Sequence, residues 1–227
     1  MSRAPNTLFP GVALVTGASS GIGRQVAISF AAEGCLKLAL LDKDGKGLGE
    51  TDNVIKSVAK DAEVHLFESD NLNTDQILKN MSLVIDRFGR IDYAVNCAGI
   101  YGPTNPSHNV TTTEFDQVMD TNFRGLWLCS PRNSGLQSSK AAIISLTRSD
   151  AIDYAKHQIR VNCVCPGVIE TPMTANVPEN DPAVQTAAMR RKGTPQEVAD
   201  AVLFLSSSKA SFIQGTALSV DGGYTIS

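Results

Sequence analysis

The chain lacks an excess of either charge: 20 lysines and arginines stand against 23 aspartates and glutamates, a net charge of −3 over 227 residues. Nucleic acids and anionic membranes are bound through basic patches. The balance therefore predicts neither a nucleic-acid nor a membrane partner. No apolar run reaches membrane-spanning length, and residues 1–11 contain no signal-peptide core, so we expect a cytoplasmic protein.

Histidine and cysteine are also scarce and scattered. The three histidines share no spacing, and Cys163-Val-Cys165 is too tight for a C-x₂-C zinc pair. We therefore predict no metal site. The five cysteines are expected to be reduced, buried and structural. These residues are His65, His108, His157, Cys35, Cys97, Cys129, Cys163 and Cys165.

What is present is an alternation of short apolar runs, rich in branched residues, with longer stretches of helical period. This pattern predicts an α/β fold in which helices cover both faces of a parallel sheet. No linker or repeat interrupts it, so we expect a single domain over residues 1–227. Strands are expected at 11–17, 36–42, 62–69, 91–99, 159–167 and 216–223, and helices at 22–34, 74–89, 111–129, 138–157 and 194–207.

One strand is missing from this alternation. Only eight residues, SPRNSGLQ, separate the helices expected at 111–129 and 138–157. Two helices on one side of a parallel sheet need a strand between them. Without it the neighbouring strands would lie about 10 Å apart, twice the usual spacing, and buried backbone groups would stay unpaired. We expect that a segment is absent near Ser130/Pro131; the alternative is a rebuilt sheet.

Glycines crowd the turn after the first strand, in the stretch Thr16-Gly17-Ala18-Ser19-Ser20-Gly21-Ile22-Gly23. Glycine lets the backbone approach a pyrophosphate, whose charge is attracted to the free N–H groups of a helix amino terminus. Asp42 ends the second strand about twenty residues later, where a carboxylate binds adenosine ribose hydroxyls. The spacing predicts a dinucleotide site.

Further motifs follow TGASSGIG in order: Asn96-Cys97-Ala98-Gly99, Asn122, Lys140, Pro166-Gly167 and Thr171. In these motifs the chain resembles the classical short-chain dehydrogenases/reductases over nearly its whole length. The resemblance implies one Rossmann-fold domain with strand order 3-2-1-4-5-6-7, usually in a homotetramer. The strand missing here is the family's fifth, which normally carries the catalytic serine.

The resemblance also implies the cofactor contacts. Asp70 and Asn71 would flank the adenine, Asn96 and its neighbours the ribose, and the loop after Pro166 the nicotinamide. The full implied set is Gly17, Ser19, Ser20, Gly21, Ile22, Gly23, Asp42, Lys43, Asp70, Asn71, Asn96, Ala98, Gly99, Lys140, Pro166, Gly167, Ile169, Thr171 and Met173.

The residues leave the choice between NADP and NAD open. The Asp42 carboxylate repels a 2′-phosphate and so favours NAD. Lys43 follows it directly and could bind that phosphate, whereas Ser20 offers only a hydroxyl where many NADP enzymes of the family carry Arg or Lys. Biosynthetic reductases of the family often use NADPH. We expect NADP, with NAD as the alternative.

The usual proton donor of the family is absent. In the family, a tyrosine four residues before the lysine protonates the carbonyl oxygen, but Lys140 has Leu136 at that place. None of the four tyrosines has a lysine four residues after it. Asn122 and Lys140 remain as catalytic candidates. Hydride addition to a cationic C=N⁺ bond needs no proton, so this pattern favours an iminium substrate.

Three functions are therefore expected, in order. The first is an NAD(P)H-dependent iminium reductase, similar to the tyrosine-lacking iminium reductase/Diels–Alderases of fungal indole-alkaloid biosynthesis, in which the pocket also directs a cyclisation. The second is a conventional carbonyl reductase or alcohol dehydrogenase whose tyrosine is obscured by the absent segment. The third is an inactive cofactor-binding pseudo-dehydrogenase. The mainly apolar loop 171–193 is expected to cover an apolar, polycyclic small-molecule substrate.

Overall fold

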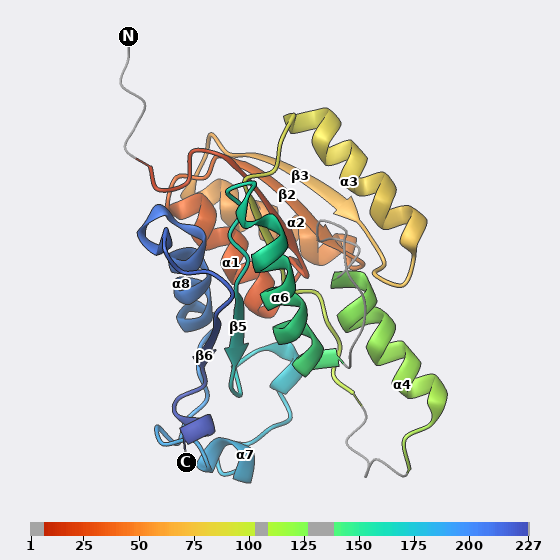
Figure 1. The fold of residues 1–227 in the computed structure, drawn as a ribbon, viewed down its shortest axis with the longest axis vertical. Coiled ribbons are helices and arrows are strands. Elements are labelled where there is room, and N and C mark those ends of the chain that lie inside the picture. The colour runs from red at the N-terminus through yellow and green to blue at the C-terminus, as the bar shows by residue number, and fades with distance from the viewer. Residues whose placement is uncertain (1–6, 103–108, 127–138, 227) are drawn as a thin grey trace.

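In the part of the chain that the structure describes, the strands pair only in parallel, and helices follow them in the expected alternation (Figure 1). The computed structural model describes residues 7–102, 109–126 and 139–226. The strands are β1 (Val12–Thr16), β2 (Lys37–Asp42), β3 (Glu63–Glu68), β4 (Tyr93–Asn96), β5 (Cys163–Pro166) and β6 (Ala217–Val220). The helices are α1 (Gly21–Ala32), α2 (Gly45–Val58), α3 (Thr74–Phe88), α4 (Thr112–Met119), α6 (Ser139–Ala155), α7 (Pro182–Gln185) and α8 (Pro195–Ser206). Shorter turns are η2 (Asp120–Arg124), η3 (Pro172–Thr174), η4 (Ser208–Ala210) and η5 (Tyr224–Ile226).

The sheet is divided in two. One part has the order β3-β2-β1-β4, and the other pairs β5 with β6. The expected Rossmann order 3-2-1-4 is confirmed, and β5 and β6 are the strands expected to be sixth and seventh. The division falls between β4 and β5, where the sequence lacks a strand. Within the described residues the sheet is not rebuilt to close this break.

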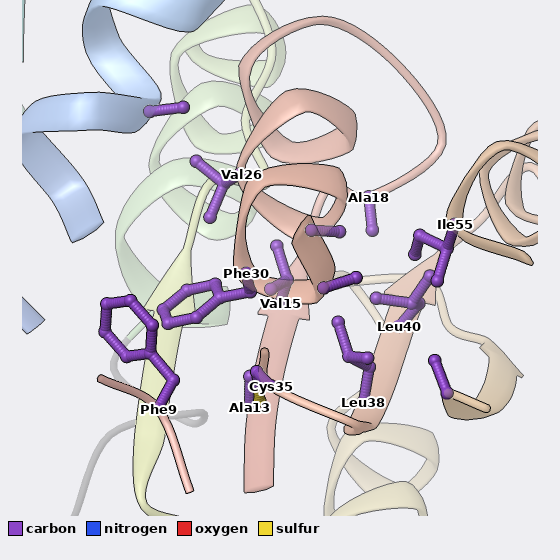
Figure 2. Packing of buried hydrophobic residues seen from close by; sticks show 14 of the residues in the cluster. Phe9, Ala13, Val15, Ala18, Val26, Phe30, Cys35, Leu38, Leu40 and Ile55 are labelled. Carbon is purple, nitrogen blue, oxygen red and sulfur yellow. The ribbon is translucent and has the colours of Figure 1, made fainter. Parts of the chain in front are cut away.

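Side chains of β1 alternate between two helical layers, as the period of two along a strand requires. Ala13 and Val15 face α1 and belong to the larger core cluster, together with Leu38 and Leu40 of β2 (Figure 2). Leu14 faces the opposite way, into a smaller cluster that includes residues of α3. All five residues of β1 are buried. This burial on both faces explains why β1 is a continuous apolar run.

Three aromatic rings close the core beside the start of β1. The rings of Phe9 and Phe30 meet edge to face at 4.9 Å, and Phe9 meets Tyr93 in the same way at 5.3 Å. Phe30 stacks on Tyr93 at 5.6 Å. Such pairs add about 0.5–1.5 kcal/mol each beyond the burial of their area. These ring contacts hold the segment that leads into β1 against α1 and against the start of β4.

Helix α2 was not expected, because three glycines in its first five residues weaken the helical pattern. The side chain of Asp44 caps it by accepting a hydrogen bond from the backbone N–H of Gly47 at 3.0 Å. Leu48, Thr51 and Ile55 form its buried face at helical spacing. Of the helices in the described part of the chain, none is long and apolar enough to span a membrane.

Two predicted elements differ in their internal structure. The helix expected at 111–129 is α-helical only to Met119 and continues as the π-helix η2, while residues 127–129 lie outside the described part. The strand expected at 159–167 is reduced to β5. In residues before β5, side-chain amides replace the ladder: Asn162 bonds to Ile213 O and Thr216 N, at 3.1 Å each.

Candidate functional site

The turn between β1 and α1 leaves no room for a side chain at two of its positions. Gly17 has φ +70°, and a Cβ there would lie 2.7 Å from the backbone nitrogen of Ala98. A Cβ on Gly23 would lie 2.1 Å from the carbonyl oxygen of Gly17. Glycine is therefore required at both positions. The turn therefore lies directly against the backbone that follows β4, and these two segments form one side of the candidate site.

Helix α1 begins without a side-chain cap. Ser20 stands at its N-cap position but its side chain accepts no capping hydrogen bond, and no acidic residue lies in the first turn. Helices α2, α3, α4, α7 and α8, in contrast, each begin with a capping side chain. Uncapped N–H groups and the positive end of the helix dipole attract an anion. This amino terminus fits a pyrophosphate.

The Asp42 carboxylate lies directly beside the glycine turn. It accepts hydrogen bonds from the backbone N–H groups of Ser19 and Asp44, at 3.1 Å each. Its carboxylate oxygens can accept further hydrogen bonds, and its side chain is only half-buried. Lys43 is exposed. The prediction that Asp42 and the glycine turn share one site is consistent with this geometry.

Helix α2 supports the turn from behind, and sequence reasoning missed this. The hydroxyl of Thr51 is fully buried and donates a hydrogen bond to Ala18 O at 2.8 Å. The guanidinium of Arg24 bonds to Thr51, to Gly47 O and to Glu50. Arg24 is therefore occupied within the protein. The i, i+3, i+7 spacing of Leu48, Thr51 and Ile55 was the signal for this support.

The segment after β3 lies on the other side of Asp42. Asp70 is exposed, and its carboxylate accepts a hydrogen bond from Leu72 N at 3.0 Å. Asn71 lies against Gly125, where a Cβ would be 2.9 Å from that of Asn71. The loop after β3 is thus held against Gly125, the residue that follows η2. Asp70 is exposed and Asn71 half-buried, and their contact with an adenine remains a prediction.

The backbone after β4 is held by hydrogen bonds on two sides. Thr16 O accepts from Cys97 N at 3.2 Å, and Thr16 Oγ1 accepts from Ala98 N at 3.3 Å. A Cβ on Gly99 would lie 3.1 Å from Oδ1 of Asn122. Thr16 opens the glycine-rich stretch but was not among the predicted cofactor contacts. Burial raises the pKa of the neighbouring Cys97 thiol to about 12, so this thiol is neutral and unreactive.

Asn122 lies in η2, and both ends of its side-chain amide are hydrogen-bonded. Its Oδ1 accepts from Ile100 N at 2.7 Å, and its Nδ2 donates to Ile100 O at 3.0 Å. The residue is 7% exposed. Asn122 is therefore well placed to position the backbone after β4. Its predicted catalytic role remains a prediction.

The loop after β5 approaches α1. A Cβ on Gly21 would lie 3.2 Å from Cγ2 of Thr171, so the glycine turn and the predicted nicotinamide loop meet here. Gly167 lies against Asp221, because a Cβ on Gly167 would be 2.8 Å from the Cα of Asp221. The hydroxyl of Thr174, another residue not predicted, fastens the loop by bonding to Ile169 O and accepting from Thr171 N.

The remaining predicted residues differ in accessibility. Ile169 is 4% exposed, and Ile22 is half-buried and packs against the core. Pro166 is exposed and Met173 is 54% exposed. Lys140 lies in the first turn of α6, but the structure does not describe its side chain. Leu136, His108 and Cys129 lie outside the described residues.

A cavity of about 300 Å³ lies beyond this loop, among residues of the predicted substrate-covering segment and the end of β6. Ile169, Val184, Ala187 and Met189 give it an apolar wall, while Arg191 and Asp221 are polar. Within residues 7–102, 109–126 and 139–226, no group of His, Cys, Asp and Glu side chains is arranged to hold a metal ion.

Comparison with known families gives two matches that together cover most of the chain. Residues 11–134 match the model described as short chain dehydrogenase. Residues 130–225 match the model described as enoyl-(acyl carrier protein) reductase. The two matches meet at residues 130–134, inside the region where a segment is expected to be absent.

Relatives resemble the chain over their whole length. Levodione reductase of Leifsonia aquatica is 34% identical over 260 residues, covering 98% of this chain and 97% of the relative. The 2-(R)-hydroxypropyl-CoM dehydrogenase of Xanthobacter autotrophicus is 35% identical over 247 residues, covering 94% of this chain and 98% of the relative. Both alignments are longer than the 227 residues of the chain, so the relatives carry residues that it lacks.

Solved structures share the fold. The crystal structure of levodione reductase superposes with a TM-score of 0.86 at 34% identity, over 96% of this chain and 99% of that one. The 3-ketoacyl-(acyl-carrier-protein) reductase of Brucella melitensis, solved in complex with NADH, gives a TM-score of 0.84 at 27% identity, over 96% of this chain and all of that one.

Proposed function

The chain belongs to the short-chain dehydrogenase/reductase family and is an NAD(P)-dependent oxidoreductase, and we propose that it interconverts a ketone and a secondary alcohol. This corresponds to the second of the expected functions. The observation that carries its dinucleotide dependence is the uncapped amino terminus of α1, which opens between Asp42 and Thr171. The names of the relatives, reductases and dehydrogenases, support the ketone/alcohol chemistry.

Different residues of the chain bind different parts of the dinucleotide. The N–H groups of the first turn of α1 bind the pyrophosphate, and Gly17 and Gly23 leave room for it. Asp42 accepts hydrogen bonds from the adenosine ribose hydroxyls. Thr171 lies beside Gly21, where the nicotinamide half of the site begins. When bound, the nicotinamide donates or accepts the hydride.

We further propose NAD rather than NADP as the coenzyme. A 2′-phosphate on the ribose would lie against the Asp42 carboxylate, and like charges at this distance repel. Arg24 is already paired with Glu50 at 3.0 Å and is not free to neutralise that phosphate. Lys43 is the cation next to Asp42 that remains exposed. The balance of these charges supports NAD.

A second candidate is the reduction of a cationic C=N⁺ substrate, followed by cyclisation directed by the pocket. One observation favours it: Leu136, four residues before Lys140, cannot donate a proton. An iminium carbon accepts hydride and leaves a neutral amine, with no proton required. An inactive cofactor-binding protein is the third candidate, because loss of the donor also fits decay. The apolar substrate and the homotetramer stay proposals.

Coenzyme binding and turnover distinguish these functions. The purified chain is titrated with NADH and NADPH by fluorescence and then given cyclic ketones and a cyclic iminium, with absorbance of the reduced nicotinamide followed. Ketone reduction with NADH supports the main proposal, and reduction of the iminium alone supports the second candidate. Binding without turnover of either substrate overturns both. Absence of dinucleotide binding overturns the assignment of the site.

A further inference from the structure

Three consecutive basic residues lie near the end of the segment 171–193, and they differ in their partners. Arg191 is neutralised, because its guanidinium donates to both carboxylate oxygens of Glu197, at 3.0 and 2.6 Å. Arg190 is exposed, and Lys192 is half-buried. Among the ion pairs of the described residues, none includes Arg190 or Lys192. In this part of the chain, Lys192 is therefore a partly desolvated cation without an anionic partner.

The backbone fixes the place of Lys192. The next residue, Gly193, forms a parallel bridge with Ile169. The N–H of Gly193 donates to Val168 O at 2.9 Å, and its carbonyl accepts from Glu170 N at 2.8 Å. A Cβ on Gly193 would lie 2.7 Å from Cδ1 of Ile169, so the two segments touch here. Lys192 therefore lies where the end of the loop returns to its start.

The ammonium of Lys192 reaches η3 at this point. Its Nζ donates a hydrogen bond to Thr174 O at 3.4 Å. Thr171, at the N-cap position of η3, lies against Gly21 at the amino terminus of α1, with 3.2 Å between its Cγ2 and a Cβ on Gly21. One turn of 3₁₀-helix advances about 6 Å. The flexible four-carbon stem of lysine allows its ammonium to move over this distance.

Lys192 also has donors that the protein does not use. An ammonium carries three N–H donors and no acceptor. The contact with Thr174 O occupies one of them, at a distance beyond the usual range of an N–H···O bond. Glu170, which the bridge brings beside the loop end, is exposed and forms no ion pair among the described residues. Because Lys192 is partly removed from water, its attraction to an anion is strengthened.

We infer that Lys192 binds the pyrophosphate of the coenzyme, together with the amino terminus of α1. This inference rests on the coenzyme site and not on the ketone/alcohol chemistry. The ammonium leaves Thr174 O, which then bonds to water, and donates to a phosphate oxygen instead. Thr171 lies at the start of the segment 171–193 and Lys192 near its end. Coenzyme binding therefore holds both ends of this segment.

Binding affinities test this inference without measuring turnover. Dissociation constants are measured by calorimetry for NADH and for ADP-ribose, which keeps the pyrophosphate and lacks the nicotinamide. Lys192→Met keeps an apolar stem and removes the charge, and both constants should rise at least about tenfold, because a charge-assisted hydrogen bond is lost. Lys192→Arg keeps the charge and should bind both ligands like the parent. Arg190→Met removes the same charge two residues away and, as the matched control, should leave both constants unchanged.

Salt provides a second measurement on the same proteins. The contact is only partly buried, so ions screen it. The difference in NADH affinity between the parent and Lys192→Met should therefore shrink as the salt concentration rises from about 0.05 to about 0.5 M. A difference that stays constant over this range would mean that Lys192 acts through the packing of its stem, which would overturn the inference.

Three further results would overturn it: an unchanged NADH constant in Lys192→Met, an equal rise in Arg190→Met, or a rise for NADH with none for ADP-ribose. The last result would place the contact on the nicotinamide half of the coenzyme. If Lys192→Met does not fold, Lys192→Gln is measured in its place with the same expectations. A parent that binds NADH no better than its Lys192 variants refutes this inference alone, whereas a parent that binds no dinucleotide refutes the coenzyme site.

Discussion

Asn122 holds the backbone of Ile100 through both ends of its side-chain amide. The two hydrogen bonds, 2.7 Å to Oδ1 and 3.0 Å from Nδ2, satisfy the N–H and the C=O of one residue. The π-helix η2 places this amide over Gly99. The backbone that follows β4 is therefore positioned by a residue 22 positions later in the chain.

Replacement of this amide should destabilise the protein and loosen the site. Asn122→Ala leaves two backbone groups without partners, and we expect a loss of about 2–3 kcal/mol in the free energy of unfolding. Urea unfolding measures this loss. Asn53→Ala, an exposed position on α2, is the matched control and should change stability by less than about 0.5 kcal/mol. Equal effects of the two variants would contradict the positioning role of Asn122.

A tyrosine at position 136 should increase ketone reduction. Leu136→Tyr creates the Tyr-x-x-x-Lys spacing with Lys140, and a positioned general acid typically contributes about 10²–10⁴-fold in rate. Turnover of cyclic ketones with NADH measures the gain. Leu136→Phe supplies the ring without the hydroxyl and should give no gain. Equal rates for the two variants would exclude proton donation from this position.

Removal of the Asp42 charge should change the coenzyme preference. Asp42→Asn keeps the shape of the side chain and removes its repulsion of a 2′-phosphate. We expect the ratio of the NADPH to the NADH dissociation constant to fall at least about tenfold, equivalent to about 1.4 kcal/mol. Fluorescence titration measures both constants. Asp61→Asn, an exposed change of the same charge, should leave the ratio unaltered; an unchanged ratio in Asp42→Asn would remove the argument for NAD.

Alanine should be tolerated at one glycine and not at another. In Gly23→Ala the Cβ would lie 2.1 Å from Gly17 O, so we expect a loss of about 1–3 kcal/mol and weaker NADH binding. A Cβ on Gly49 has no atom within 4 Å, so Gly49→Ala should stabilise α2 by up to about 1 kcal/mol. Thermal unfolding and NADH titration measure both. Unaltered NADH binding in Gly23→Ala would contradict the assigned cradle.

Glu197 should stabilise the fold only above acidic pH. Hydrogen bonds from Arg191 and from the backbone of Thr194 lower the pKa of Glu197 from 4.5 to about 2. Because the folded state binds this proton less tightly than the unfolded chain, the stabilisation is complete above pH 4.5 and is lost as the pH falls toward 2. Glu197→Gln should therefore be less stable than the parent at pH 7, with a difference that shrinks below pH 4.5.

Urea unfolding of both proteins at pH 7, 5 and 3.5 measures this difference. Glu33→Gln, the same change at an exposed carboxylate, is the matched control. A constant difference between Glu197→Gln and its parent over this range would mean that the carboxylate charge does not matter. Arg191 and the N-terminal cap of α8 would then keep their positions without a contribution from this charge.

Much of the first half of the fold could be predicted from the sequence. β1 and β2 are apolar runs because helices cover both of their faces, and the prediction therefore placed them within a residue or two. Helix α3 was equally clear: Asn73 caps its start, and Gly89 ends it with φ +76°. Asp42 was found by its distance from the glycines, because strand and helix lengths in this unit vary little.

Other features could not be predicted, for physical reasons. The transition from α4 to η2 depends on which backbone N–H bonds to which carbonyl, and side-chain periodicity does not record this. Thr16 and Thr51 act through contacts between segments far apart in the sequence. The helical pattern of α2 was obscured in the sequence by glycines, which the buried face of the helix tolerates. The approach of Thr171 to Gly21 depends on how the two parts of the sheet are placed.

The packing of α8 along α1 joins the beginning of the chain to its end (Figure 1). Gln25 donates a hydrogen bond to Gln196 at 2.7 Å, and Val26 and Phe30 share a core cluster with Val202. During synthesis, the apolar side of α1 therefore emerges from the ribosome long before its cover does. A nascent chain must keep this surface from aggregation until residue 206 has been made, and a chain that stops earlier has no means to bury it.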